Sequence, residues 1–175
     1  MTLPPPVVVG IDPGKEGAVA IIPAAGVDPS GVLPVVAGLP YPPDDAQPDA
    51  ARLAAMLRSG AWTIARAGVE DVNSHDMGRQ SAFVFGQGVG AILATLQILG
   101  VPIVRVRPQE WQRTIGATRK GGLRDPLGPV SRLFPRVDLF PGRTRKAHMG
   151  IVDALGIAEH VRAGLADPIG GLPFG

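Results

Sequence analysis

The sequence predicts an α/β fold with a mixed five-stranded sheet flanked by helices, on three observations. Five short apolar runs rich in β-branched residues are typical of buried strands, and other segments have helical periodicity. The first three runs follow one another with only turns or loops between them, which indicates antiparallel neighbours. The later runs are separated by helices, which indicates helical crossovers between strands.

The expected elements follow in order along the chain. The strands are expected at residues 7–11, 17–22, 32–38, 67–72 and 103–106. The helices are expected between the cap Asp49 and the stop Gly60, and at residues 81–99, 108–115 and 149–162. Residues 1–6 and 164–175 are expected to be flexible tails. The segment after residue 115 is broken by glycine and proline, and it is expected to be a mobile loop.

Composition narrows the possible classes of protein. The 175 residues fit one domain, residues 1–175, with a substantial core. Cysteine is absent, which excludes disulfides, thiolate metal sites and thiol catalysis. The sequence has no basic amino terminus followed by an apolar run, and no uninterrupted apolar stretch near the roughly 20 residues of a membrane span. A cytoplasmic protein without membrane contact is expected.

Positive charge is concentrated in one part of the chain. Residues 105–146 hold 11 Lys or Arg and three acids, a local charge of +8, and the rest of the chain carries −6. This basic segment is a candidate surface for a polyanion. On charge alone, a solvated face is an equally good interpretation.

Three carboxylates interrupt segments that should be buried. Asp12 ends the first strand, Glu70 lies in the fourth, and Asp153 lies in the last helix between two apolar residues. Buried acids are costly unless they are paired or bind a cation. Each acid alone is better explained by a salt bridge or a helix cap. The three together favour an oxygen-rich site for Mg²⁺ or Mn²⁺, which prefer carboxylate and water ligands.

Residues 8–14 (VVGIDPG), followed by Gly17 and Ala18, resemble the opening motif of the RuvC-type Holliday-junction resolvases of the RNase H-like superfamily. Further similarities follow in the family's order between residues 7 and 162, with phage and chloroplast relatives the most similar. They comprise residues 69–72 (VEDV), 78–81 (GRQS), Phe85, Gly86 and Gly90, then Val106, Pro108 and Trp111, residues 133–135 (LFP), 153–155 (DAL), and Ile157 with Ala158.

This resemblance implies an RNase H-like fold and a homodimer that nicks opposed strands of a four-way DNA junction, in recombination and repair. It implies two-metal phosphodiester hydrolysis, in which one ion activates water and the other stabilises the leaving 3′ oxygen. Asp12 would bridge the two ions, with Glu70 and Asp153 flanking it. Lys120, or Arg119 beside it, resembles the basic residue that the family places near the scissile phosphate.

Several polar residues are candidates for contacts with DNA. Arg79 and Gln80 resemble the base-recognition loop of the relatives, and the alternative is an exposed first turn of a helix. The basic candidates for DNA contacts are Arg119, Lys120, Arg143, Arg145 and Lys146.

Other residues have two interpretations each. Gly86, Gly90 and Ala94 form a smooth stripe, which packs either against the sheet or, as the resemblance implies, against a second subunit. Trp111 is better explained as a core residue than as a platform for base stacking. His75 and His160 are expected to be ordinary surface residues.

One feature departs from the family pattern. The closing motif often carries a fourth metal-associated residue three or four positions before the last aspartate, where this chain has Gly150 and Met149. His148 could supply the missing ligand if the helix begins at Met149.

Two rival functions therefore stay open: a nuclease that acts on RNA or unbranched DNA, and a junction-binding protein with impaired catalysis. An actin-like kinase is disfavoured, because 175 residues cannot supply its second lobe.

Overall fold

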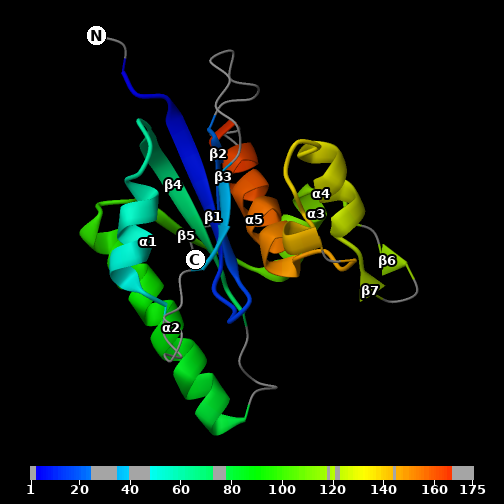
Figure 1. Cartoon of the computed structure of the whole chain (residues 1–175), viewed down its shortest axis with the longest axis horizontal. Helices are drawn as coiled ribbons and strands as arrows, with labels where there is room; N and C mark the ends of the chain where they lie inside the picture. Colours follow the sequence, from blue (N-terminus) through cyan, green and yellow to red (C-terminus); the bar gives the residue numbers. More distant parts are fainter. Residues whose placement is uncertain are drawn as a thin grey trace.

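The computed structural model describes residues 3–24, 35–39, 48–72, 78–117, 119–120, 123–143 and 145–166, with the backbone alone at 119–120, 123–124 and 143. In these parts a sheet is covered by helices on both faces (Figure 1). The expected α/β architecture with a flanked sheet is confirmed.

The central sheet has five strands in the order β3-β2-β1-β4-β5. The strands are β1 (Pro6–Asp12), β2 (Ala18–Pro23), β3 (Val35–Gly38), β4 (Thr63–Glu70) and β5 (Ile103–Val106). β1 pairs antiparallel with β2, and β2 pairs antiparallel with β3. β1 pairs in parallel with β4, and β4 with β5. The mixed five-stranded sheet predicted from the sequence is therefore confirmed.

Helices α1 (Ala50–Leu57) and α2 (Arg79–Ile98) cover one face of the sheet, and α5 (Met149–Ala166) covers the other, beside α3 (Pro108–Thr114) and α4 (Leu127–Leu133) (Figure 1). Alternate residues of β1 divide between the two faces, as the side-chain period of a strand requires. Val7, Val9 and Ile11 pack in the core under α1 and α2, and Val8 packs in the core under α5.

Helix α5 lies unusually close to the sheet because glycines leave room for its backbone. A Cβ atom on Gly10 of β1 would lie 2.1 Å from the carbonyl oxygen of Ala154 and 2.4 Å from the amide nitrogen of Ala158. A Cβ atom on Gly150 would lie 2.1 Å from the carbonyl oxygen of Glu16, in the turn after β1. These close approaches fix the start of α5 against the carboxyl end of β1.

Elements of the fold extend into both segments that the sequence analysis treats as tails. The carbonyls of Pro5 and Pro6 accept backbone hydrogen bonds from Thr63 (3.1 Å) and Ala24 (2.9 Å), so these two residues are part of the fold. Proline lacks an N–H but keeps its carbonyl, and it therefore suits the start of a strand. At the other end, α5 continues to Ala166, beyond the predicted end at residue 162. Residues 1–2 and 167–175 lie outside the described residues.

The prediction of a mobile loop after residue 115 is wrong for the described residues. The chain forms a small hairpin of β6 (Arg119–Lys120) and β7 (Leu123–Arg124), then α4, then the 3₁₀ turn η1 (Pro141–Arg143). Pro129 does not break α4 because it lies in the first turn, where a backbone N–H has no helical partner. The Asp125 carboxylate accepts a hydrogen bond of 3.0 Å from the Leu127 N–H and fixes the start of this helix.

Smaller differences concern the ends of elements. β3 begins at Val35, and the predicted residues 32–34 lie outside the described residues. β4 begins and ends earlier than predicted, at Thr63 and Glu70. The predicted cap Asp49 is confirmed, since its carboxylate accepts a 3.0 Å hydrogen bond from the Arg52 N–H.

Helix α2 is long and apolar enough to cross a membrane by length and composition, which the sequence analysis did not anticipate. One such helix is weak evidence, since core helices of soluble proteins pass the same test. Its residues Val89, Ile92 and Leu96 are buried against the sheet. Phe83 and Ile98 are 67% and 81% exposed, so α2 also presents apolar surface outward. The absence of membrane contact stays a prediction.

Candidate active site

The two strand carboxylates lie at the same edge of the sheet. β1 and β4 are parallel neighbours, and Ile11 lies opposite Val69. Asp12 and Glu70 are the next residues on these two strands, so both lie at the carboxyl end of the pair. Asp153 approaches from the second turn of α5, which the glycine contacts hold against β1. The fold thus brings together three acids that are far apart in the sequence.

Each of the three acids has a raised pKa, and burial is the largest cause in every case. The pKa of Asp12 is raised by burial, against the opposing effects of the Gly14 N–H and of His148. Burial and the charge of Asp12 raise the pKa of Glu70 to about 7, although a hydrogen bond from Trp111 lowers it. Burial, Asp12 and Glu70 raise the pKa of Asp153 to about 7. The acids are therefore close enough to repel one another.

Trp111 fixes the orientation of Glu70. Its indole N–H donates a 2.9 Å hydrogen bond to Glu70 Oε1, and its side chain is only 1% exposed. The prediction of a core residue is confirmed, but the sequence analysis missed the contact with Glu70. Gly156 of α5 lets the ring lie close, because a Cβ atom there would be 2.5 Å from the indole.

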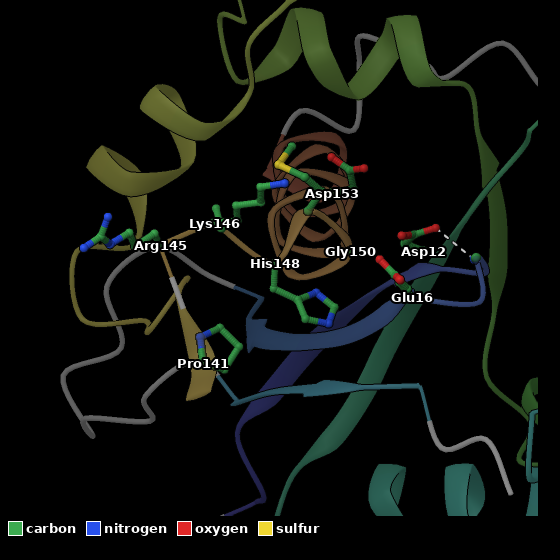
Figure 2. Close-up of a pocket in the computed structure, with 11 residues that line it drawn as sticks. Asp12, Glu16, Pro141, Arg145, Lys146, His148, Gly150 and Asp153 are labelled. Carbon is green, nitrogen blue, oxygen red and sulfur yellow. Dashed lines mark hydrogen bonds between the residues drawn. The ribbon is translucent and has the colours of Figure 1, made fainter. Parts of the chain in front are cut away.

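Asp12 and Asp153 line one open pocket of about 540 Å³ at the start of α5 (Figure 2). We call this the acidic pocket; its other lining residues include Glu16, Arg145, Lys146, His148 and Met149. Glu16 comes from the turn between β1 and β2, and the sequence analysis did not select it. Glu16 lies in the tight turn that follows Asp12, and this closeness in the sequence could have indicated that it lies near the site.

The donor set of the site suits a hard divalent cation. All three acids offer carboxylate oxygens, and among the described residues no hydrogen bond reaches the Asp153 carboxylate. Across the described ranges, no three His, Asp or Glu side chains are arranged to hold one ion together. The chemistry of the carboxylate donors, rather than a preformed arrangement of three ligands, therefore supports a divalent cation at this edge.

His148 caps helix α5. Its carbonyl accepts hydrogen bonds from the N–H groups of Ile151 (3.0 Å) and Val152 (3.2 Å), and its Nδ1 lies 3.3 Å from the Ile151 nitrogen. The helix begins at Met149, the condition under which His148 was expected to be usable as a ligand. With Nδ1 engaged, Nε2 is the ring nitrogen that could bind a metal. Met149 is 45% exposed and lines the acidic pocket.

Arg79 and Gln80 form the exposed first turn of α2. For these two residues the helical interpretation is correct, and a loop containing them is wrong. Gly78 is the N-cap of this helix, without a side-chain capping hydrogen bond. Residues 73–77, with His75, lie outside the described residues.

The basic candidates divide into two groups. Arg145 and Lys146 line the acidic pocket, and Figure 2 shows the Lys146 side chain extending toward Asp153 while Arg145 points away. Arg119 and Lys120 lie in β6, on the α5 side of the sheet (Figure 1). The structure describes only the backbone of these two residues. The same holds for Arg143.

His160 is a partly buried residue that has a partner on a neighbouring helix. Its Nδ1 lies 2.7 Å from the Thr114 hydroxyl and joins α5 to α3. Burial lowers the pKa of the imidazole, with a smaller opposing effect from Glu110.

The glycine stripe of α2 does not pack against the sheet. A Cβ atom on Gly86 or Gly90 would meet nothing within 4 Å, and Ala94 is exposed. The interpretation as internal packing is therefore wrong. The stripe is an outward face of the helix.

No family model matches the chain, and no curated protein matches it in sequence. Solved structures with the same fold include two of RuvC from Thermus thermophilus. One, described as RuvC in complex with Holliday junction substrate, has 17% identity and a TM-score of 0.58. The other has 20% identity and a TM-score of 0.59; both matches cover 91% of this chain and 96% of the RuvC chain.

These matches establish the class of fold: the chain has the α/β fold, with a mixed five-stranded sheet, of these RuvC structures. The resemblance to the two T. thermophilus RuvC structures extends over nearly the whole length of the RuvC chain.

Proposed function

We propose that the protein is a RuvC-type endonuclease that resolves Holliday junctions or other branched DNA by two-metal-ion hydrolysis. The observation that carries this proposal is that Asp12, Glu70 and Asp153 lie together at one edge of a RuvC-like fold, where burial raises the pKa of each carboxyl. The structure of T. thermophilus RuvC with a Holliday junction supports the choice of branched DNA. The expected setting is the cytoplasm of a bacterium, with the gene carried by the bacterium or a phage.

In this proposal the chain positions two divalent ions, Mg²⁺ or Mn²⁺. Asp12 from β1, Glu70 from β4 and Asp153 from α5 would hold these ions. Bound ions of this kind supply an activated water and neutralise charge on the leaving oxygen and the transition state. Trp111 holds Glu70 through its 2.9 Å hydrogen bond, and the Gly14 N–H holds Asp12 through one of 3.0 Å.

Basic residues would position the phosphate backbone around these acids. Lys146 and Arg145 line the acidic pocket, which places positive charge beside it. We propose that they bind DNA together with Arg79, Gln80, Arg119, Lys120 and Arg143, and that Lys120 serves at the scissile phosphate.

Nicking assays test this function directly. Purified protein with Mg²⁺ or Mn²⁺ is given a four-way junction, a flap, a duplex and an RNA–DNA hybrid of matched sequence. We expect paired nicks on opposed strands of the junction and much slower cleavage of the other substrates. Preferential cleavage of the hybrid or the duplex would support the first rival. Tight junction binding without cleavage in either metal would support the impaired binding protein.

We propose that the protein acts as a homodimer through the outward face of α2. Gly86, Gly90 and Ala94 let a second helix approach, and the exposed apolar residues Phe83 and Ile98 lie on the same helix. A symmetric pair would present two acidic sites to opposed DNA strands.

Gly90→Leu tests this interface. Since nothing lies within 4 Å of a Cβ atom at Gly90, leucine fits the monomer and obstructs only a partner helix. We expect sedimentation to show a dimer for the wild type and a monomer for the variant, with unchanged circular dichroism. Ala51→Leu, at an exposed position of α1, is the control. A variant that sediments as the wild-type dimer would place the interface elsewhere.

Met149→Asp tests the incomplete metal shell. Met149 lines the same pocket as Asp12 and Asp153, and its thioether is a poor ligand for Mg²⁺. We expect an added carboxylate to raise nicking at limiting Mg²⁺ and to tighten Mg²⁺ binding in calorimetry. His148→Ala should weaken Mn²⁺ binding if the imidazole is a ligand. If neither substitution changed metal binding or the nicking rate, Asp12, Glu70 and Asp153 would suffice as metal ligands.

A further inference from the structure

A second hollow, of about 640 Å³, lies between the edge strand β3 and the start of α5. Its walls come from β3, from the segment that leads from α4 to η1, and from the first turns of α5. We call it the side groove, and its main lining residues are Val36, Ala37, Arg136, Val137, His148 and Ile151.

The side groove adjoins the acidic pocket. Pro141 and His148 line both hollows. The boundary between them is fixed, because the His148 N–H donates a 2.8 Å hydrogen bond to the carbonyl of the buried Leu139. A flexible strand that places one phosphate at the acids can therefore continue past His148 into the side groove.

The chemistry of the side groove suits a nucleotide. Val36, Val137 and Ile151 give it apolar walls. Arg136 is exposed, and within the residues that the structure describes it forms no ion pair. The other charged residue, Asp138, accepts a 2.8 Å hydrogen bond from the Phe140 N–H and serves the local turn. Sugars and bases pack on apolar surface, and an arginine binds phosphate.

We propose that the side groove binds the single DNA strand next to the cleaved phosphate, with Arg136 on a neighbouring phosphate. This proposal rests on the proposed nuclease function and extends it, because it gives the cleaved strand a path from the acids toward β3. The proposal adds Arg136, which the sequence analysis did not select, to the basic residues that are proposed to bind DNA.

Binding measurements without metal test the contact apart from cleavage. The affinity for a fluorescent four-way junction is measured in EDTA at several salt concentrations. We expect Arg136→Ala to lower the slope of log K against log salt by about 0.7–0.9, the loss of one phosphate contact. The control is Arg58→Ala, an exposed arginine after α1 on the opposite face of the sheet, which should leave the slope unchanged.

Cross-linking tests the path of the strand. Because the chain has no cysteine, Arg136→Cys gives a single thiol for a maleimide photo-cross-linker. We expect cross-links to nucleotides that flank the nicked position on the cleaved strand, and none there from Arg58→Cys. If the wild type binds and nicks junctions, an unchanged salt slope for Arg136→Ala, or cross-links only to distant duplex arms, would contradict the proposal that the side groove binds the cleaved strand. If the wild type itself neither bound nor nicked junctions, the proposed function would fail first.

Discussion

Asp12→Asn, Glu70→Gln and Asp153→Asn are each expected to abolish junction cleavage while leaving junction binding nearly unchanged. Each substitution removes one metal ligand and little binding surface. Metal-ion stabilisation of the transition state is worth several kcal/mol, and about 1.4 kcal/mol corresponds to tenfold, so the loss should reach at least about 10³-fold. Single-turnover nicking with Mg²⁺ and anisotropy binding in EDTA measure the two properties separately.

These amides should not unfold the protein. In Glu70→Gln the amide oxygen can still accept the hydrogen bond from the Trp111 indole. The pKa of Asp153 rises from 3.8 to about 7 in the folded state, so the metal-free protein loses stability as the pH rises through this range. Asp153→Asn removes that loss, and its Tm at pH 8 in EDTA should equal or exceed that of the wild type. Substantial residual cleavage in a folded variant would remove that residue from the site.

Local sequence patterns were enough to predict most of the fold and to select the three acids. The apolar β-branched runs identified all five strands. In β1, β2 and the second half of β4, burial on both faces leaves few other residue types possible. The acids were conspicuous for the same reason, because a carboxylate in such a run needs a compensating partner. The direction of pairing followed from whether a helix intervened between two strands.

Contacts between distant segments could not be predicted in this way. The bond from Trp111 to Glu70 depends on how α3 packs under α5, and the sequence separation of 41 residues leaves no local trace. Glu16 enters the acidic pocket because its turn packs on Gly150 of α5. The hairpin and α4 in the basic segment were missed because proline and glycine were interpreted only as helix breakers, although the first helical turn tolerates both.

The closeness of α5 to the sheet, on which the whole site depends, leads to the second large effect. At Gly10, a Cβ atom would meet backbone atoms of Ala154 and Ala158 at 2.1 and 2.4 Å. Backbone atoms in the middle of a helix cannot move aside as a side chain can, so α5 must shift as a unit. Such a shift would separate Asp153 from Asp12 as well as weaken the core.

Gly10→Ala is therefore expected to lower the free energy of unfolding by about 3 kcal/mol, the upper part of the usual range for overpacking. For a protein of this size that corresponds to a fall in Tm of roughly 6–12 °C. The matched control is Gly38→Ala in β3, where the nearest atom to a Cβ, the Gly17 carbonyl oxygen, lies at an ordinary 3.9 Å. Urea unfolding of both variants, read by circular dichroism, measures the difference. If Gly10→Ala were as stable as Gly38→Ala, the backbone contact between β1 and α5 would be looser than described, and the convergence of the three acids would need another cause.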